Sequence, residues 1–506
     1  MVYTLMALFF VFGYIAIALE HNLNVDKAAS ALLTAVIVWT LLVIGADTLL
    51  ANQLTDGLNA TTLLNTELRH HLAEIAEILF FLMGAMVIVE LVDAHDGFAA
   101  ITNRIHTTNA VTLLWTIGAL TFFFSALLDN LTTTIVMVSL LRKLVADKQL
   151  RLWFVGIVVV CANAGGAWSP IGDVTTTMLW IGNQITASNI IVDLIVPSLI
   201  AAMVPLLILT VVFKGQKVYR PEPVKAPIKS SNINYLGSYS GEIQATVMTQ
   251  QGLAENNFSS LPSSTATVAM TEEDEDAAAL DSVTSRMRIS ILALGLGALA
   301  FVPLFKTLTQ LPPYMGVLFG VGVLWVFTEL VHRHDNWHIK QRMTVVGVLT
   351  RVDMSSILFF LGILLAVSAL ATAGHLLDMA TWLDNTFGNL YVINVLIGLL
   401  SSLVDNVPLV AGAMKMYPLL ADSAMAGLSG GELARQSQFL QDGAFWHFLA
   451  YCAGVGGSCL IIGSAAGVAA MGMEKISFMW YLKHISGLAL IGYLAGAAAY
   501  IIIHVI

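Results

Sequence analysis

The dipeptide Asp-Asn occurs twice within strongly apolar sequence, each time at the centre of a similar block. The first block contains Asp129-Asn130 and the second contains Asp405-Asn406. A carboxylate at membrane depth is costly, and chains seldom keep one there without a use for it. Two such residues in matching contexts indicate a duplicated membrane protein whose halves each contribute to one ion site.

The composition is that of a polytopic membrane protein. Of the 506 residues, 57% are hydrophobic and only 11% are charged, whereas soluble domains carry about 25% charged residues. The net charge of −10 includes an acidic run at 272–276 outside the apolar segments, so it does not indicate a basic partner. The three cysteines lie in apolar segments and have no metal-site or disulfide pattern. We expect no enzymatic activity, no cofactor and no nucleic-acid partner.

The apolar segments predict an all-α membrane protein. A span needs roughly 20 apolar residues, and ten segments qualify: 2–19, 28–46, 72–92, 152–180, 190–213, 286–304, 312–330, 353–372, 444–471 and 478–503. Two further blocks, 110–141 and 387–418, are too long for one crossing and too short for two with a turn. Because each has the Asp-Asn pair at its centre, we expect two re-entrant helical hairpins, whose tips line a cavity or are buried in protein.

The distribution of positive charge predicts the topology. With both hairpins returning to their own side, most lysines and arginines fall on one side of the membrane, which is cytoplasmic by the positive-inside rule. The other side receives Arg69, Lys306, Lys415 and Arg435. The first apolar segment lacks a basic flank and is expected to be a retained span. Two membrane halves, 1–213 and 286–506, are then joined by a disordered cytoplasmic linker at 214–285. We expect the inner membrane of a bacterium.

Three short stretches recur in both halves in the same order. Besides the Asp-Asn pairs, residues 78–81 match 357–360, and residues 161–166 match 452–457. Matching spans run in opposite directions in the predicted topology. This indicates an inverted repeat, with broken helices and a substrate site near the membrane midplane where the halves meet.

Candidate site residues cluster at the hairpin tips and at the breaks in two long spans. Gly165-Gly166 and Pro170 are expected to interrupt the span 152–180, and Gly456-Gly457 the span 444–471. The first half offers Ser125, Asp129, Asn130, Thr132, Thr133, Asn163, Ser169, Asp173 and Thr175. The second half offers Ser401, Asp405, Asn406, Ser458 and Ser464. The predicted site is therefore asymmetric, because the second broken span contributes no carboxylate.

These side chains are oxygen ligands, which suit a hard cation such as Na⁺ or Li⁺. No Arg or Lys lies at the breaks, so a carboxylate substrate would lack a charged clamp there. A desolvated carboxylate also accepts a proton more readily. If Na⁺ and H⁺ compete for Asp129, Asp173 and Asp405, alternating access produces sodium/proton exchange. Glu74, near the outer end of its span, is a candidate for a proton pathway or for pH sensing.

Other interpretations fit parts of this pattern. The aspartates also suit helix caps, a role compatible with ion binding, and the Gly-Gly pairs also suit close helix packing. The same scaffold is compatible with an arsenite-like permease for oxyanions or neutral hydroxides, or with a sodium-coupled dicarboxylate symporter. A membrane receptor with a partner-binding linker is a further alternative, although a receptor needs no inverted halves.

The motifs resemble those of the NhaD-type sodium/proton antiporters of the ion transporter superfamily. The resemblance covers most of the chain outside 214–285 and is carried by residues 123–133, 163–176 and 401–408. The Asp-Asn tips are shared with arsenite permeases, whereas the stretch 165–175 is more specific to NhaD-like chains. The resemblance implies a homodimer in the lipid membrane, with a fixed and a moving part in an elevator-like cycle. It also implies functional roles for Asp129, Asp173 and Asp405.

Overall fold

A computed structural model describes residues 1–18, 20–50, 59–99, 104–221 and 283–505. The described residues are almost entirely helical and contain no strand beyond two isolated bridges. Nine of the helices in these ranges are long and apolar enough to cross a membrane. The predicted class, an all-α polytopic membrane protein, is therefore confirmed. Most of the predicted linker, residues 222–282, lies outside the described residues.

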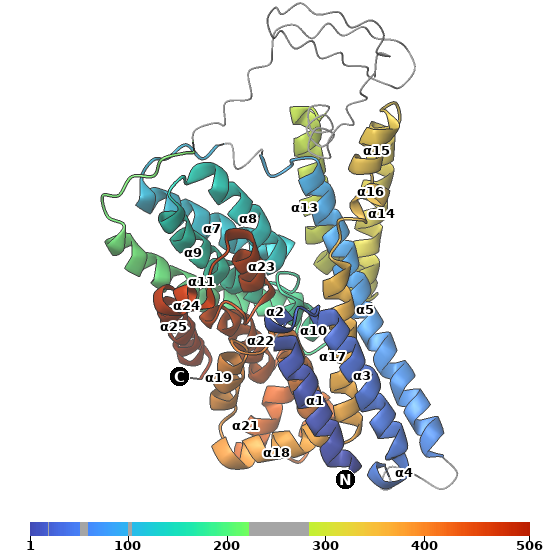
Figure 1. The fold of residues 1–506 in the computed structure, drawn as a ribbon. Helices are drawn as coiled ribbons and strands as arrows, with labels where there is room; N and C mark the ends of the chain where they lie inside the picture. The colour runs from blue at the N-terminus through green and yellow to red at the C-terminus, as the bar shows by residue number, and fades with distance from the viewer. Residues whose placement is uncertain (19, 51–58, 100–103, 222–282, 506) are drawn as a thin grey trace, which may run out of the picture.

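Six long helices pack together into one part of the molecule, which we call the scaffold block (Figure 1). They are α1 (Val2–Ala18), α3 (Lys27–Ile44), α5 (Ala60–Ala94), α13 (Ser285–Thr309), α14 (Pro313–Val331) and α17 (Met354–Thr372). The short helices α2 (Glu20–Leu23), α4 (Ala46–Leu49), α15 (Trp337–Met343) and α16 (Val345–Val348) adjoin them. Helix α5 begins well before the predicted residue 72, and its 35 residues span about 52 Å, more than a bilayer core requires.

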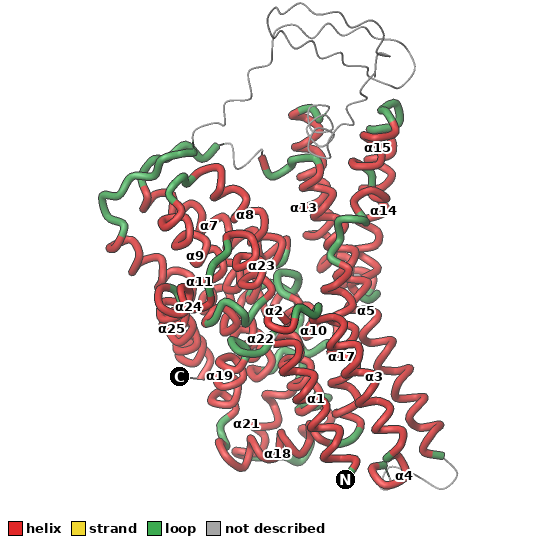
Figure 2. The backbone as a smooth tube through the Cα atoms, in the orientation of Figure 1, coloured by secondary structure: helices red, strands yellow, loops and turns green. Residues whose placement is uncertain are grey.

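The remaining helices form the hairpin block, which contains both Asp-Asn motifs. Its first-half helices are α7 (Ala110–Leu128), α8 (Asn130–Leu144), α9 (Lys148–Ala167), α10 (Val174–Ile181) and α11 (Ala187–Val212). Its second-half helices are α18 (His375–Phe387), α19 (Leu390–Leu400), α20 (Asn406–Met416), α21 (Gly430–Gln436), α22 (Ala444–Gly456), α23 (Ala465–Glu474), α24 (Phe478–His484) and α25 (Ser486–Val505). Figure 2 shows the non-helical breaks that separate these helices inside the block.

Hydrogen bonds bring the two ends of each hairpin together. Ala110 N, at the start of α7, donates to Gln216 O (3.1 Å), and Ala146 N, just after α8, donates to Tyr219 O (2.8 Å). Both ends of the first hairpin therefore meet the segment that follows α11. In the second hairpin, Tyr417 Oη after α20 donates to Asp384 Oδ1 in α18 (3.2 Å). Although α7 alone is long enough to cross a membrane, the chain turns back after it, as a re-entrant hairpin requires.

The two broken spans break later than expected. Helix α9 continues through Gly165 and Gly166 and ends at Ala167, and α22 continues to Gly456. These glycines instead allow close packing, because a Cβ on Gly165 would lie 2.2 Å from Phe122 O, and one on Gly456 would lie 2.1 Å from Gly398 O. The close-packing interpretation is thus correct for these positions, and the breaks themselves begin at Trp168 and Gly457.

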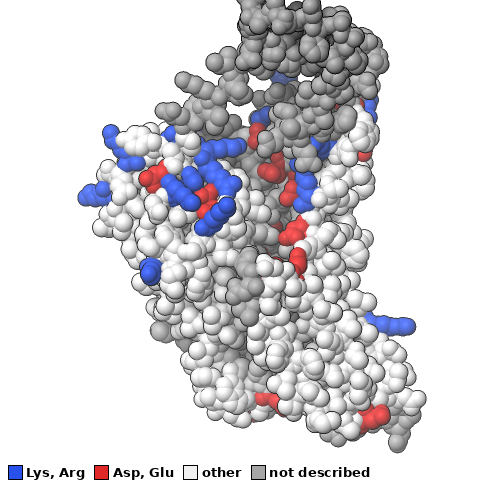
Figure 3. Space-filling view, in the orientation of Figure 1, with Lys and Arg blue, Asp and Glu red and all other residues white. Residues whose placement is uncertain are grey.

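Lysine and arginine side chains gather on one face of the hairpin block (Figure 3), which we call the basic face. Arg142, Lys148, Arg151 and Lys475 line one shallow cavity of the hairpin block. Arg142 and Arg151 both donate to the buried Glu474 at the end of α23, through Nε to Oε1 (2.6 Å) and Nε to Oε2 (3.0 Å). Burial raises the pKa of Glu474, but the hydrogen bonds from the two arginines outweigh it and keep the pKa below the ordinary 4.5. This carboxylate ties α23 to both α8 and α9.

We expect Glu474→Gln to lower the free energy of unfolding by about 2 kcal/mol at neutral pH, because a buried ion-pair network loses one partner. A carboxyl with a lowered folded pKa stabilises the protein above its unfolded pKa and loses that effect as the pH falls through the folded pKa. The difference from wild type should therefore shrink below about pH 4.5. Thermal unfolding in detergent at several pH values measures this, and Glu432→Gln on the exposed α21 is the control. A difference that is constant with pH would contradict it.

Candidate ion site

Each of the three candidate aspartates caps a helix that starts at a break. Asp129 accepts from Thr132 N (2.8 Å) at the start of α8, and Asp173 accepts from Thr175 N (2.9 Å) at the start of α10. Asp405 accepts from Val407 N (3.1 Å) at the start of α20. The capping interpretation is therefore correct for all three, and it places each carboxylate at the positive end of a helix dipole.

Asp129 is the only residue between α7 and α8, and it makes the whole turn of the hairpin. Its backbone has φ 78° and ψ 163°, a region that glycine normally occupies and that costs other residues about 1–3 kcal/mol. Thr132 compensates in part, since its backbone N–H and its hydroxyl donate to the two carboxylate oxygens of Asp129 (2.8 and 3.0 Å). An acid kept at a strained position indicates a use beyond the turn itself.

Five buried polar residues from both halves meet in one hydrogen-bonded network. Asn130 Nδ2 donates to Asp173 Oδ2 (2.8 Å) and to Asn163 Oδ1 (3.1 Å). Asn406 Nδ2, from the other hairpin tip, lies 3.4 Å from both oxygens of Asp173. Asn163 Nδ2 donates to Ser464 Oγ (2.9 Å). All five side chains belong to residues that are at most 4% exposed, so this is a buried polar centre.

Most of the predicted serines hold the backbone instead of facing this centre. Ser125 Oγ donates to Ala162 O (2.6 Å), and its counterpart Ser401 Oγ donates to Ala453 O (2.7 Å). In a similar way, Ser169 bonds the carbonyl of Ala126 and Ser458 that of Val455. Thr175 Oγ1 donates to Asp173 (3.0 Å), whereas the buried hydroxyl of Thr133 has no hydrogen-bond partner among the described residues.

The two broken spans begin their second helices in the same way but with different caps. Asp173 caps α10, and Ser464 caps α23 by accepting from Gly467 N (3.2 Å). A buried acid in the first half thus corresponds to a serine in the second. The structure agrees with the asymmetry seen in the sequence.

Three neighbouring cavities lie along the boundary between the blocks. A narrow one of about 40 Å³ is lined by Asp129, Asn130 and Asp173, and another of about 70 Å³ is lined by Asp405. A wider one of about 660 Å³ is lined by Thr132, Glu90 and other residues of both blocks. Figure 3 shows acidic side chains along this hollow, towards the basic face. Among the described residues, no three acids, histidines or cysteines are placed to hold a metal ion together, so amide, hydroxyl or carbonyl oxygens are needed as well.

Lys27 is a charged residue beside the site that the sequence interpretation missed. No lysine lies where the helices break, but α3 of the scaffold block places Lys27 next to the site. Its side chain lines the cavity of Asp129 and Asp173 and also that of Asp405. Lys27 follows a polar loop in the sequence, where it fits the positive charge expected outside a span, and no local pattern connects it to residues 129 or 405.

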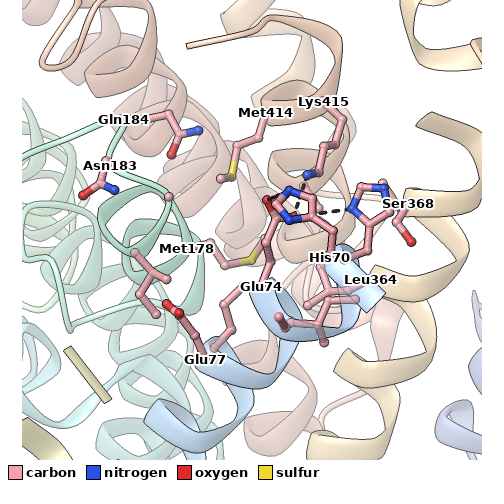
Figure 4. A pocket seen from close by; sticks show the side chains of 18 residues that line it. His70, Glu74, Glu77, Met178, Asn183, Gln184, Leu364, Ser368, Met414 and Lys415 are labelled. Carbon is pink, nitrogen blue, oxygen red and sulfur yellow. Dashed lines mark hydrogen bonds and ion pairs between the residues drawn. The ribbon is translucent and has the colours of Figure 1, made fainter. Parts of the chain in front are cut away.

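A separate pocket of about 420 Å³, which we call the outer pocket, is lined by residues of α5, α10, α17 and α20 (Figure 4). Glu74, the predicted proton-pathway residue, lines it and pairs with Lys415 Nζ of α20 (2.7 Å) and with His70 Nε2 (3.3 Å). Helix α10 lies between this outer pocket and the cavity of Asp129, because its residue Met178 lines the pocket and its residue Thr177 lines the cavity. The ion pair between Glu74 and Lys415 links the two blocks beside this pocket.

Helices that break at a buried polar centre, to which residues of the first and the second part of the chain contribute, define a membrane protein of the transporter class. A sequence profile of the citrate transporter family, CitMHS, matches residues 14–437. Sodium/proton antiporter 1 of Arabidopsis thaliana is 42% identical over 499 residues, which cover 99% of this chain and 72% of that protein. The Na⁺/H⁺ antiporter NhaD of Vibrio cholerae is 26% identical over 98% of this chain and 91% of that protein. NhaD of Alkalimonas amylolytica is 27% identical over 97% and 89%.

The chain therefore belongs to the citrate transporter family, and these relatives support the NhaD type of sodium/proton antiporter within it. The named relatives are transporters, which agrees with the expectation that the chain is not an enzyme.

We expect Gly165→Ala to disrupt the site, because its Cβ would lie 2.2 Å from Phe122 O and force α7 away from α9. Overpacking of this kind costs about 1–3 kcal/mol. The rate of ion exchange should fall even if the protein still folds, because the tip residue Asp129 directly follows α7 and moves with it. Gly412→Ala in α20 is the matched control, because open space surrounds it. Measuring ion exchange and thermal unfolding together tests this, and a fully active Gly165→Ala protein would contradict it.

Proposed function

We propose that this chain is a secondary antiporter that exchanges Na⁺, and also Li⁺, for H⁺ at a carboxylate site near the membrane midplane. The observation that carries the proposal is the network in which Asp173 of one half meets Asn406 of the other and Asn130 of its own. Relatives named sodium/proton antiporters support the same function. Two halves inserted in opposite directions would produce such a shared centre.

The geometry suggests how one site can serve both ions. Asparagine amides now donate to Asp173, and rotation of an amide would present its oxygen to a cation instead. A Na⁺ ion could then be held by Asp129, Asp173 or Asp405 together with amide, hydroxyl and freed carbonyl oxygens. A proton on the same carboxylates removes the charge that attracts Na⁺. The two ions therefore exclude each other, and each crosses in a different half of the cycle.

The cavities suggest alternating access. The widest cavity lies towards the basic face, which we take as cytoplasmic. Helix α10 separates the narrow cavity of Asp129 and Asp173 from the outer pocket. An elevator-like displacement of the hairpin block along the scaffold block would move the site from one side to the other. We further propose a homodimer in the lipid membrane. The bacterial inner membrane stays a prediction, because relatives come from a plant as well as from bacteria.

Cation-induced collapse of an acid-inside pH gradient in vesicles tests the proposal. Asp129→Asn, Asp173→Asn and Asp405→Asn should each lower Na⁺-dependent and Li⁺-dependent proton movement at least about tenfold, because each removes a carboxylate that binds either ion. Asp422→Asn, in the exposed 3-10 helix Asp422–Met425, is the matched control. If wild-type protein moves no protons in response to either cation, the antiporter proposal is wrong.

Sodium-coupled carboxylate transport is a second candidate function. The matching family is described as a citrate transporter, and Lys27 places a cation beside the site. The same vesicles, loaded without a pH gradient, would reveal it as Na⁺-dependent uptake of labelled citrate. We expect no such uptake, because three aspartates line the cavities that Lys27 also lines, and their negative charge outweighs the positive charge of one lysine and repels a carboxylate.

Breaking the outer ion pair should shift the protein away from the state with the wide cavity. Ile135 is 40% exposed and lines that cavity, so a cysteine placed there reports its accessibility. We expect Lys415→Gln to lower the labelling rate of Ile135→Cys by a thiol reagent roughly twofold to fivefold, the range for one exposed ion pair. The three native cysteines are buried and keep the background low. Lys415→Arg is the control. Equal labelling rates in both variants would argue against a role of the Glu74–Lys415 ion pair in this equilibrium.

A further inference from the structure

Lys27 lies at the boundary between the two blocks, next to the candidate site. Alone among the described residues, it lines all three cavities around the candidate site. One of these cavities contains Asp129 and Asp173, and another contains Asp405. A single ammonium group thus borders every aspartate of the site.

The fold positions Lys27 but leaves its ammonium group available. Lys27 starts α3, and the cap Asp26 accepts from Ala28 N (2.8 Å) and from Ser355 Oγ of α17 (2.7 Å). The hydrogen bond from Ser355, followed by that from Ala28, keeps the pKa of Asp26 below its ordinary value. The carboxylate of Asp26 is therefore charged but already bonded. Lys27 Nζ lies instead over the ring of Phe359, 4.7 Å from its centroid.

Acidic side chains outnumber basic ones among the residues that line the three cavities. Asp129, Asp173 and Asp405 border the two small cavities, and the wide cavity adds Glu20, Glu90, Asp353 and the cation Arg351. Within the described residues, Lys27 Nζ forms no ion pair with any of these acids. An ammonium on a flexible four-carbon stem can approach an acid or withdraw from it without a change of fold.

We propose that Lys27 is a tethered cation that competes with Na⁺ for the site carboxylates. When the site holds no Na⁺, the ammonium approaches Asp405 and its neighbours and offsets their charge. When Na⁺ is bound, repulsion moves the ammonium towards Phe359, where the aromatic face stabilises it. The lysine thereby lowers the affinity for Na⁺ and speeds Na⁺ release into the wide cavity. This inference rests on the proposed exchange function.

The test is the Na⁺ dependence of exchange in vesicles for Lys27→Gln, Lys27→Met and Lys27→Arg. Removing one unit charge beside the site should lower the apparent KM for Na⁺ roughly threefold to tenfold and lower the maximal rate. Lys27→Arg keeps the charge and should stay near wild type. Lys214→Gln, an exposed lysine beyond α11 that lines none of these cavities, is the matched control.

The outcomes separate the two proposals. If wild type exchanges ions but Lys27→Gln and Lys27→Met keep or raise its KM, the tethered-cation role is wrong and the exchange function stands. If Lys27→Arg behaves like Lys27→Gln, the side chain acts through its shape and the role is again wrong. If wild type moves no protons, both proposals fail. For a variant that transports too slowly, thermal stabilisation of purified protein by Na⁺ gives the same comparison, and a half-saturating concentration equal to wild type would overturn the role.

Discussion

The whole site depends on satisfying backbone groups where helices break inside a membrane-spanning block. Each break leaves N–H groups that no lipid can bond, and an aspartate or serine caps the next helix to supply the missing acceptor. Asp129, Asp173, Asp405 and Ser464 all do this. Because the caps are mostly carboxylates, the same residues that allow the breaks also place negative charge in a buried centre. The polar centre thus follows from the way in which the breaks are stabilised.

Glycines allow the broken spans to pack closely against the hairpin helices within each half. Gly165 brings α9 against the backbone of α7, and Gly456 brings α22 against that of α19. The serines Ser125 and Ser401 then bond carbonyls on the neighbouring broken span. The hairpin tips are therefore held by contacts within the hairpin block. Contacts to the scaffold block include the ion pair between Glu74 and Lys415 at the outer pocket and leave cavities towards the basic face.

Much of the fold was predictable because its signals are local. The length of the apolar segments predicts the spans. Each hairpin is predicted by a polar Asp-Asn pair inside a block that is too long for one crossing and too short for two. The break positions were less predictable, since Gly165-Gly166 reads equally as an interruption or as a packing surface. The choice depends on whether another backbone lies against it, here that of Phe122. Helix α5 begins at Ala60 because its polar first turns extend beyond the apolar stretch on which the prediction rested.

By itself, the sequence determined the helical membrane class, the two hairpins and the acids and amides at their tips, because these follow from hydrophobic length and from the cost of buried charge. Only the tertiary structure decided which of them meet. Asn130, Asn163, Asp173, Asn406 and Ser464 share one network, whereas most of the predicted serines bond backbone carbonyls instead. It also brought Lys27 to the aspartates from α3. Contacts between residues hundreds of positions apart depend on how helices pack, and no local pattern records that packing.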